Sequence, residues 1–206
     1  MSSQPFSFVR FLAVKKIFRG IITNTYQFYT DQNHRIVDIT WKKHTDCLSS
    51  KSATESKVEV ITRMFPSDAN PAGNVFGGEI LKQIDIVAGI VAQRHCGTNA
   101  VTASIDRVDF LKPVFVGDLL ILNARLNCIK NSSMEIEVKV ESENLRSGLR
   151  TVTGTALVTS VALDDNGKPT TVPKLSLQTE EDKKKFADGL ARMEQRSKER
   201  RREKAH

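Results

Sequence analysis

The sequence predicts an α+β domain in which one curled antiparallel β-sheet wraps around a single long apolar helix. Its segments come in the order short strand, long helix and four strands, with turn-like connections between the strands. Connections as short as these favour antiparallel pairing. The helix is apolar almost all round, so we expect it to be buried. Its apolar residues are Ile80, Leu81, Ile84, Ile86, Val87, Ile90 and Val91.

The first elements follow from local pattern. Residues 58–63 alternate in polarity as a short strand does. A polar loop follows, and its Pro and Gly residues prevent a helix from starting before Gly77. The helix is expected from Gly77 to Cys96. Four strands are then expected over 100–110, 118–129, 133–141 and 150–163, and the third alternates apolar and charged residues with a clean period of two.

The chain ends in a charged helix. Thr179 followed by Asp182 forms a capping pattern, and Phe186, Leu190 and Met193 stand at helical spacing. We therefore expect a helix that docks through a narrow apolar stripe. The predicted organisation is a basic N-terminal extension over 1–56, the domain over 57–177 and the charged C-terminal helix over 178–206.

The positive charge lies in the two ends of the chain. Of 206 residues with a net charge of +7, the segment 58–179 holds 12 Lys/Arg and 13 Asp/Glu. A core with nearly equal numbers of positive and negative side chains binds a phosphate backbone poorly, so no nucleic-acid partner is expected. The run from Lys198 to Lys204 is interrupted by Glu199 and Glu203, as in a solvated helix end.

The N-terminal segment leaves the compartment open. Residues 1–30 contain Arg10, Lys15, Lys16 and Arg19 and no acid, a composition that resembles an organellar transit peptide. A disordered extension, or a start codon placed too far upstream, is the more ordinary explanation. We expect a cytoplasmic protein, with the mitochondrial matrix as the alternative if residues 1–30 are a transit peptide.

Other compositional signals exclude several kinds of site. Cys47, Cys96 and Cys128 are odd in number and have no metal-like spacing, which indicates a reducing compartment and no disulfide framework. The four histidines show no metal-ligand spacing. The sequence has no run of about 18 apolar residues, so no membrane-spanning helix is expected.

The loop and the start of the helix hold the candidate functional residues. Asp85 shares a helix face with Leu81, Ile84, Ala88 and Gly89, and a carboxylate among apolar neighbours is costly unless it is paired. It is therefore either functional or part of a structural ion pair. His95 and Cys96 are adjacent on the helix and do not face each other, so we expect His95 to cap the helix C-terminus rather than to catalyse.

Asn70, Gly77 and Gly78 each have two interpretations. Asn70 is either a turn residue or a functional amide. The glycines either allow close packing of the helix on the sheet or expose unpaired backbone N–H groups at its start.

Six motifs together resemble one family. Asp68-Ala69-Asn70, Gly73-Asn74-Val75, Gly77-Gly78 with Asp85, Arg94-His95-Cys96, Thr102-Ala103-Ser104 and 133–138 are similar to motifs of the acyl-CoA thioesterases with a hotdog fold. The resemblance covers about residues 57–195 and extends to the bacterial short-chain type and the brain cytosolic acyl-CoA hydrolase type. Phe76 stands where the vertebrate enzymes carry His and the bacterial ones carry Phe.

The resemblance implies a hotdog homodimer, further assembled into a hexamer, that hydrolyses fatty acyl-CoA to free acid and CoA. It places the chemistry on an Asn in the loop and an acid fifteen positions later, which are Asn70 and Asp85 here. It also implies that Asn70 of one subunit meets Asp85 of the other. Our hypothesis is that Asp85 activates a water molecule or attacks the thioester itself, while the N–H groups of Gly77 and Gly78 hold the oxyanion.

The CoA moiety needs polar contacts at strand ends. We expect Lys112 and the turn formed by Lys130, Asn131, Ser132 and Ser133 to contact the diphosphate, with Arg107 or Arg150 as additions; these segments are otherwise ordinary hairpin turns. No cofactor is expected, because CoA is part of the substrate. The alternative function is a non-catalytic acyl-CoA-binding regulator, and a hotdog dehydratase is disfavoured because the loop lacks a His.

Overall fold

The computed structural model describes residues 17–18, 21–22, 29–30, 36–37 and 50–203. The chain divides into two compact units, Met1–Thr45 and Asp46–His206. In the first unit β1 (Ile17–Phe18) pairs with β2 (Ile21–Ile22), and β3 (Tyr29–Thr30) pairs with β4 (Ile36–Val37), both antiparallel. The predicted transit segment or disordered extension lies mostly outside the described residues.

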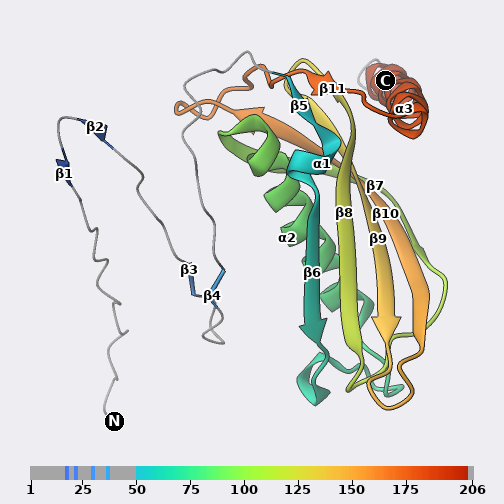
Figure 1. Ribbon diagram of the computed structural model, residues 1–206. Coiled ribbons are helices and arrows are strands. Elements are labelled where there is room, and N and C mark those ends of the chain that lie inside the picture. Colours follow the sequence, from blue (N-terminus) through green and yellow to red (C-terminus); the bar gives the residue numbers. More distant parts are fainter. Residues whose placement is uncertain (1–16, 19–20, 23–28, 31–35, 38–49, 204–206) are drawn as a thin grey trace, which may run out of the picture. The chain divides into compact units, whose positions relative to one another are not determined.

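The second unit is built on a five-stranded antiparallel sheet with the order β6-β8-β9-β10-β7 (Figure 1). The strands are β6 (Val58–Arg63), β7 (Asn99–Phe110), β8 (Leu119–Lys130), β9 (Ser133–Glu143) and β10 (Arg150–Leu163). Between β6 and β7 runs the helix α2 (Gly77–Cys96). This is the predicted α+β arrangement, with each main strand within one or two residues of its expected bounds.

The strand registers define two ends of the sheet. At one, Phe110 pairs with Gly154, and Leu119 pairs with both Glu143 and Arg63; we call this the Phe110 end. At the other lies the hairpin in which Lys130 pairs with Ser133, which we call the Lys130 end. β8 spans 12 residues, so the two ends are about 40 Å apart.

Helix α2 covers the inner face of the sheet (Figure 1). Its buried residues, including Ile84, Val87 and Val91, join alternate residues of β8, β9 and β10 in one core, to which β6 and β7 contribute fewer residues. The expectation that this helix is buried all round was wrong for the single chain, because Ile86 is 47% exposed. One sheet covers one side of a helix, and within residues 50–203 the opposite side of α2 stays open.

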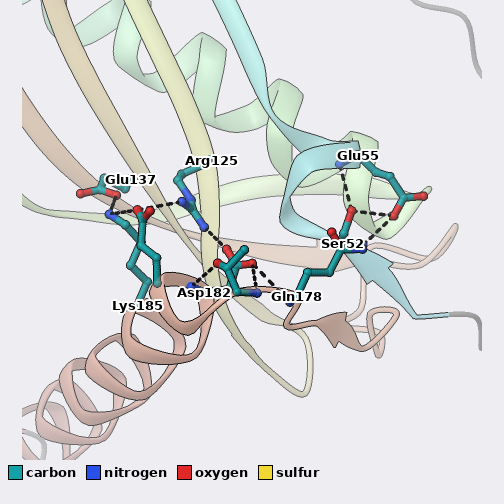
Figure 2. A network of polar contacts seen from close by, with 9 residues as sticks. Ser52, Glu55, Arg125, Glu137, Gln178, Asp182 and Lys185 are labelled. Atoms are coloured by element: carbon teal, nitrogen blue, oxygen red, sulfur yellow. Dashed lines mark hydrogen bonds and ion pairs between the residues drawn. The ribbon is translucent and has the colours of Figure 1, made fainter.

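Helix α3 (Glu180–Glu203) lies on the outer face of the sheet, opposite α2 (Figure 1). The predicted capping pattern is confirmed: the Asp182 N–H donates to Thr179 Oγ1 (3.1 Å) and the Thr179 N–H donates to Asp182 Oδ2 (3.0 Å). Asp182 also accepts from Arg125 of β8, and Lys185 pairs with Glu137 of β9 (Figure 2).

Further along α3, arginines bind a buried acid. Glu135 of β9 is fully buried, and Arg192 and Arg196 both donate to its carboxylate. Arg196 also pairs with Asp106 of β7 (2.7 Å). Buried charges of this kind are tolerated when they are paired and hydrogen-bonded, so these contacts fix the helix on the sheet.

A short segment before β6 also belongs to the folded unit. β5 (Lys51–Ser52) pairs in parallel with β11 (Leu175–Ser176), and Ser52 caps the helix α1 (Ala53–Ser56) through a reciprocal capping box with Glu55 (Figure 2). Sequence pattern placed the domain start near Lys57, whereas ordered packing begins by Lys51.

The side chain of His95 holds this segment to α2. It is fully buried, with Nδ1 3.0 Å from Ser56 Oγ and Nε2 3.0 Å from the Pro173 carbonyl. The expectation that His95 caps the C-terminus of α2 was therefore wrong. The left-handed Gly97, at φ 71°, ends the helix instead.

Candidate functional site

The loop that leads into α2 is held from both sides. A 3₁₀ turn over Pro66–Asp68 opens it, and Asp68 Oδ2 accepts the Phe65 N–H at 2.7 Å. The Val75 N–H donates to the Val114 carbonyl (2.8 Å), and Asn74 bridges to Phe115. These bonds hold the loop against the β7–β8 connection at the Phe110 end and fix the position of the loop backbone.

The side chain of Asn70 has a fixed orientation. Its Oδ1 accepts the backbone N–H groups of Ala72 (2.9 Å) and Asn74 (3.2 Å). This is the turn role expected of an Asn. With the oxygen engaged inside the loop, Nδ2 is directed away from these donors, and it donates to no acceptor among residues 50–203. The amide is thus suited to donate to a ligand.

The first turn of α2 offers unpaired donors. Phe76 is the N-cap and makes no side-chain capping bond, while the Glu79 and Ile80 N–H groups donate to the Phe76 carbonyl. Within the described part of the chain, the N–H groups of Gly77 and Gly78 have no acceptor, as is usual for the first residues of a helix. Two such donors and the positive helix end can bind a developing negative charge.

Aromatic rings enclose both glycines. A Cβ on Gly78 would lie 2.7 Å from Cε1 of Phe76, and one on Gly77 would lie 3.6 Å from Cζ of Phe110. Gly78 therefore has no room for a side chain while Phe76 keeps its position. The sequence allowed two interpretations of these glycines, close packing and exposure of backbone N–H donors. In the structure the two do not exclude each other.

Asp85 lies on the open side of α2 and is exposed. Lys82 is exposed beside it, and Gly89, one turn further on, is partly buried. The expected burial of Asp85 among Leu81, Ile84 and Ala88 is wrong for a single chain, because Ile84 and Ala88 point into the core. No hydrogen bond joins Asp85 to Asn70 or to any other side chain among the described residues.

The residues expected to contact CoA are divided between the two ends of the sheet. Lys112 follows β7 at the Phe110 end and is exposed. Lys130, Asn131, Ser132 and Ser133 form the hairpin at the Lys130 end. About 40 Å of strand separates the two groups, so one chain cannot bring both to a single diphosphate.

Edge strand β7 carries Thr102, which the sequence analysis named within a family motif but did not select as a site residue. Thr102 is exposed and pairs in register with Ser160 of β10. Ser160 is fully buried, and its Oγ has no partner in the described structure. Val158 and Ala162, on either side of Ser160, belong to the core, so Thr102 also faces the α2 side of the sheet. The alternation of this strand, once assigned, is the signal that finds Thr102.

No group of three or more His, Cys, Asp or Glu side chains in the described segments is arranged to hold a metal ion. None of the helices in those segments combines the length and apolarity needed to cross a membrane.

Residues 72–149 match the family model described as "Thioesterase superfamily". The chain is 46% identical over 128 residues to the uncharacterized acyl-CoA thioester hydrolase YkhA of Bacillus subtilis, covering 62% of this chain and 74% of that protein. It is 41% identical over 139 residues to the cytosolic acyl coenzyme A thioester hydrolase of Rattus norvegicus, covering 66% of this chain and 36% of that protein. The chain thus spans about a third of the mammalian enzyme.

Solved structures share the fold closely. An acyl-CoA hydrolase from Staphylococcus aureus, in complex with butyryl coenzyme A and coenzyme A, superposes with a TM-score of 0.70 at 36% identity, covering 76% of this chain and 95% of that one. A hexameric acyl-CoA thioesterase without ligand superposes with a TM-score of 0.70 at 39% identity, covering 74% and 97%. Structures of the Staphylococcus aureus enzyme also exist with an Asn, an Asp or a Thr replaced by Ala.

Proposed function

The chain belongs to the acyl-CoA thioester hydrolases of the thioesterase superfamily, and we propose that it hydrolyses fatty acyl-CoA to free fatty acid and CoA. The observation that carries the proposal is the start of α2, where two unpaired N–H groups adjoin a loop whose Asn70 amide is oriented to donate. A site that hydrolyses thioesters needs hydrogen-bond donors beside the thioester carbonyl, because the carbonyl oxygen becomes negative in the transition state.

The spacing of the candidate residues supports the same site. The Asn and the Asp replaced in the Staphylococcus aureus structures are fifteen positions apart, and the Thr follows the Asp by seventeen. Asn70, Asp85 and Thr102 have the same two spacings. We therefore add Thr102 to the proposed site.

Each residue has a proposed role. Asp85 takes a proton from a water molecule that attacks the thioester carbon, or attacks that carbon itself. The N–H groups of Gly77 and Gly78, with the Asn70 amide, hold the oxygen as it becomes negative. The C–S bond then breaks and the CoA thiolate takes up a proton that comes from the water molecule. If water attacks the thioester, the acid leaves directly; if Asp85 attacks, the acyl group is first held as an anhydride on Asp85, and water hydrolyses this anhydride to release the acid and restore the carboxylate. CoA is part of the substrate, so the proposal requires no separate cofactor.

The exposure of Asp85 supports an active site completed by a second subunit. A partner that covers the open side of α2 would remove water from this carboxylate, and loss of water makes a carboxylate a stronger base. We propose a homodimer in which Asn70 of one subunit faces Asp85 of the other. We further propose a hexamer, as formed by the apo thioesterase. In such an assembly one CoA would contact Lys112 of one subunit and the Lys130 hairpin of another.

The domain limits and the compartment are also proposals. We propose the thioesterase domain over 57–177, flanked by the extension over 1–56 and the helix over 178–206, with the segment from Lys51 packed against the domain. We propose a cytoplasmic protein, since relatives include a cytosolic mammalian enzyme. The mitochondrial matrix is the alternative if residues 1–30 act as a transit peptide.

Release of CoA thiol from acyl-CoAs of graded chain length tests the function. We expect turnover by the wild type and a loss of at least about 100-fold in Asn70→Ala and Asp85→Asn, with both variants still folded and assembled. Normal turnover by Asp85→Asn would refute the site. Tight binding of CoA esters without any hydrolysis would instead identify a regulator.

A further inference from the structure

Strand β7 contains a β-bulge directly after Thr102. Thr102 pairs with Ser160 of β10. The next residue of β10, Thr159, pairs with Ser104, which leaves Ala103 as the extra residue of the bulge. Bulges of this kind bend a strand and change the direction of the side chains beside them. The polar residue that we add to the proposed site therefore stands next to an irregular position of its strand.

A second bulge follows in the same strand. Val158 of β10 pairs with Ile105. The next residue of β10, Leu157, pairs with Arg107, which leaves Asp106 as the extra residue. Strand β10 keeps its regular alternation through both irregularities, so both extra residues belong to β7.

The two bulges together determine which face of the sheet Thr102 occupies. One extra residue moves every side chain beyond it to the opposite face. Ser104 accordingly faces outward, although Thr102, two residues before it, faces the α2 side. With both bulges present, Val108 packs against the core on that same side. The Leu111 N–H group donates to the Thr153 carbonyl (2.8 Å) and holds the register at the Phe110 end, so loss of one bulge would turn Thr102 away from α2.

The carboxylate of Asp106 binds both bulges from the outer face. It accepts from Ser104 Oγ (2.8 Å) and from Thr159 Oγ1 (3.0 Å), which form the residue pair directly after the first bulge. Arg196 of α3 donates to the same carboxylate at 2.7 Å, and the two side chains of this ion pair are each only 17% exposed. Solvent therefore screens this pair less than the exposed pairs that contribute little.

Arg196 connects the bulges to the centre of the sheet. Its Nη2 donates to the fully buried carboxylate of Glu135 on β9 (3.2 Å), whereas β7 itself has β10 as its one neighbour in the described sheet. On the basis of the proposed function, we propose that Asp106 and Arg196 are positioning residues, which keep Thr102 in the site by holding the two bulges of β7. The C-terminal helix then takes part in building the site, although it lies on the opposite face of the sheet.

Kinetics of Asp106→Ala in two backgrounds test this role. We expect kcat for acyl-CoA hydrolysis to fall at least about tenfold when Asp106→Ala is made in the wild type. In the Thr102→Ala background the same change should lower kcat by less than about twofold, because its effect depends on the Thr102 hydroxyl. Equal losses in both backgrounds would overturn the proposal, since Asp106 would then act without Thr102.

Arg196→Met is the second variant if Asp106→Ala does not fold. It removes the donor on α3, leaves the two hydroxyl donors in place, and should lower kcat with the same dependence on Thr102. Lys185→Met is the matched control, because Lys185 of the same helix pairs with Glu137 of β9 and with no acceptor on β7 among the described residues. Its kcat should stay within about twofold of the wild type.

Amide hydrogen exchange, measured by mass spectrometry, tests the strand without any hydrolysis. Peptides that cover residues 100–107 should exchange at least about fivefold faster in Asp106→Ala and Arg196→Met, because loosened bulges open the backbone hydrogen bonds. Lys185→Met should exchange there as the wild type does. Unchanged exchange in both variants would overturn the proposal. Faster exchange, in a protein whose wild type hydrolyses no acyl-CoA, would support the role of Asp106 in holding β7 and refute the proposed function.

Discussion

Oε1 of Glu135 lies 2.6 Å from Nη2 of Arg192, although one residue belongs to a central strand and the other to the C-terminal helix. Arg192 also donates through Nε to the second oxygen of this fully buried carboxylate, and Glu135 keeps the pKa of Arg192 raised through these hydrogen bonds. The pair thus holds α3 in a defined position on β9, where the apolar stripe of α3 is narrow.

Arg192→Met should lower the free energy of unfolding by about 1–3 kcal/mol, because part of a buried carboxylate loses its donor. Urea denaturation measures the change. Lys183→Met is the matched control, since Lys183 pairs only with Glu180 on the exposed side of α3, and such pairs contribute less than about 1 kcal/mol. Equal losses in both variants would contradict an anchoring role for Glu135.

Cys128 should resist alkylation for as long as α3 is docked. Its Sγ lies 3.8 Å from Met193 Sδ, and burial, together with the charge of Glu135, raises the pKa of the thiol to about 12. At pH 8 only about one thiol in 10⁴ would be ionised. Iodoacetamide labelling followed by mass spectrometry should be slow at Cys128 in the wild type and at least tenfold faster in Arg192→Met. Fast labelling of the wild type would show that the helix does not stay docked.

Gly189 should not tolerate a larger residue, since a Cβ there would lie 2.5 Å from Cys128 Sγ and 3.0 Å from Glu135 Oε1. Gly189→Ala is expected to lower the melting temperature even though Ala favours helix by about 1 kcal/mol. Ala187→Gly, on the exposed side of α3, gives the reference value for helix propensity alone. A higher melting temperature in Gly189→Ala would contradict the close approach of α3 to β8.

Stability should fall in mildly acidic solution because of His95. Burial lowers the pKa of this imidazole below 6.5, with the Pro173 carbonyl and Glu55 opposing the shift and Lys51 assisting it. The unfolded chain therefore binds a proton more readily than the folded one, so the contribution is complete above pH 6.5 and is lost as pH falls below it. Denaturation curves between pH 5.5 and 7.5 should show this slope in the wild type and not in His95→Gln.

Gly78→Ala, alone and combined with Phe76→Ala, should distinguish the effect of Gly78 on stability from its effect on turnover. The new methyl would displace the Phe76 ring, so we expect a loss of stability that Phe76→Ala relieves in the double variant. Turnover should remain depressed about 100-fold in both, because the methyl stands beside the donors that hold the oxyanion. Recovery of full turnover in the double variant would place the oxyanion elsewhere.

Much of the fold follows from the sequence because each element carries its own signal. The helix predicted from Gly77 to Cys96 is confirmed, and the period of two over 133–141 predicts the strand that the structure extends to Ser133–Glu143. Local pattern predicts the face on which Glu135 lies but not its burial. Alternation with Met134 and Ile136 assigns Glu135 to the outer face of the sheet, whereas its burial depends on a helix that begins 45 residues later. The packing of the segment from Lys51 was likewise not predicted, because it depends on pairing with β11, which lies far along the chain.

The candidate site could be predicted as residue types but not as an arrangement. The resemblance of the loop and helix motifs selects Asn70 and Asp85, yet it does not indicate that Asp85 faces away from its own core. Lys112 and the Lys130 hairpin follow consecutive strands, and such strands of an antiparallel sheet finish at opposite ends, as the registers show. The orientation of Asp85, in contrast, depends on which side of the helix the sheet covers, and that is decided by the whole chain.

The open side of α2 has a genetic consequence. Asp85 is exposed in the single chain, and in the proposed homodimer, where Asn70 of one subunit faces Asp85 of the other, a defect at Asp85 affects the site shared with the subunit that supplies Asn70. In a cell that expresses two alleles, one with Asn70→Ala and one with Asp85→Asn, a mixed pair would assemble one site with both defects and one site with neither. Two inactive alleles would then complement each other, and an allele with only one defect would inactivate half of the sites it shares with a healthy partner.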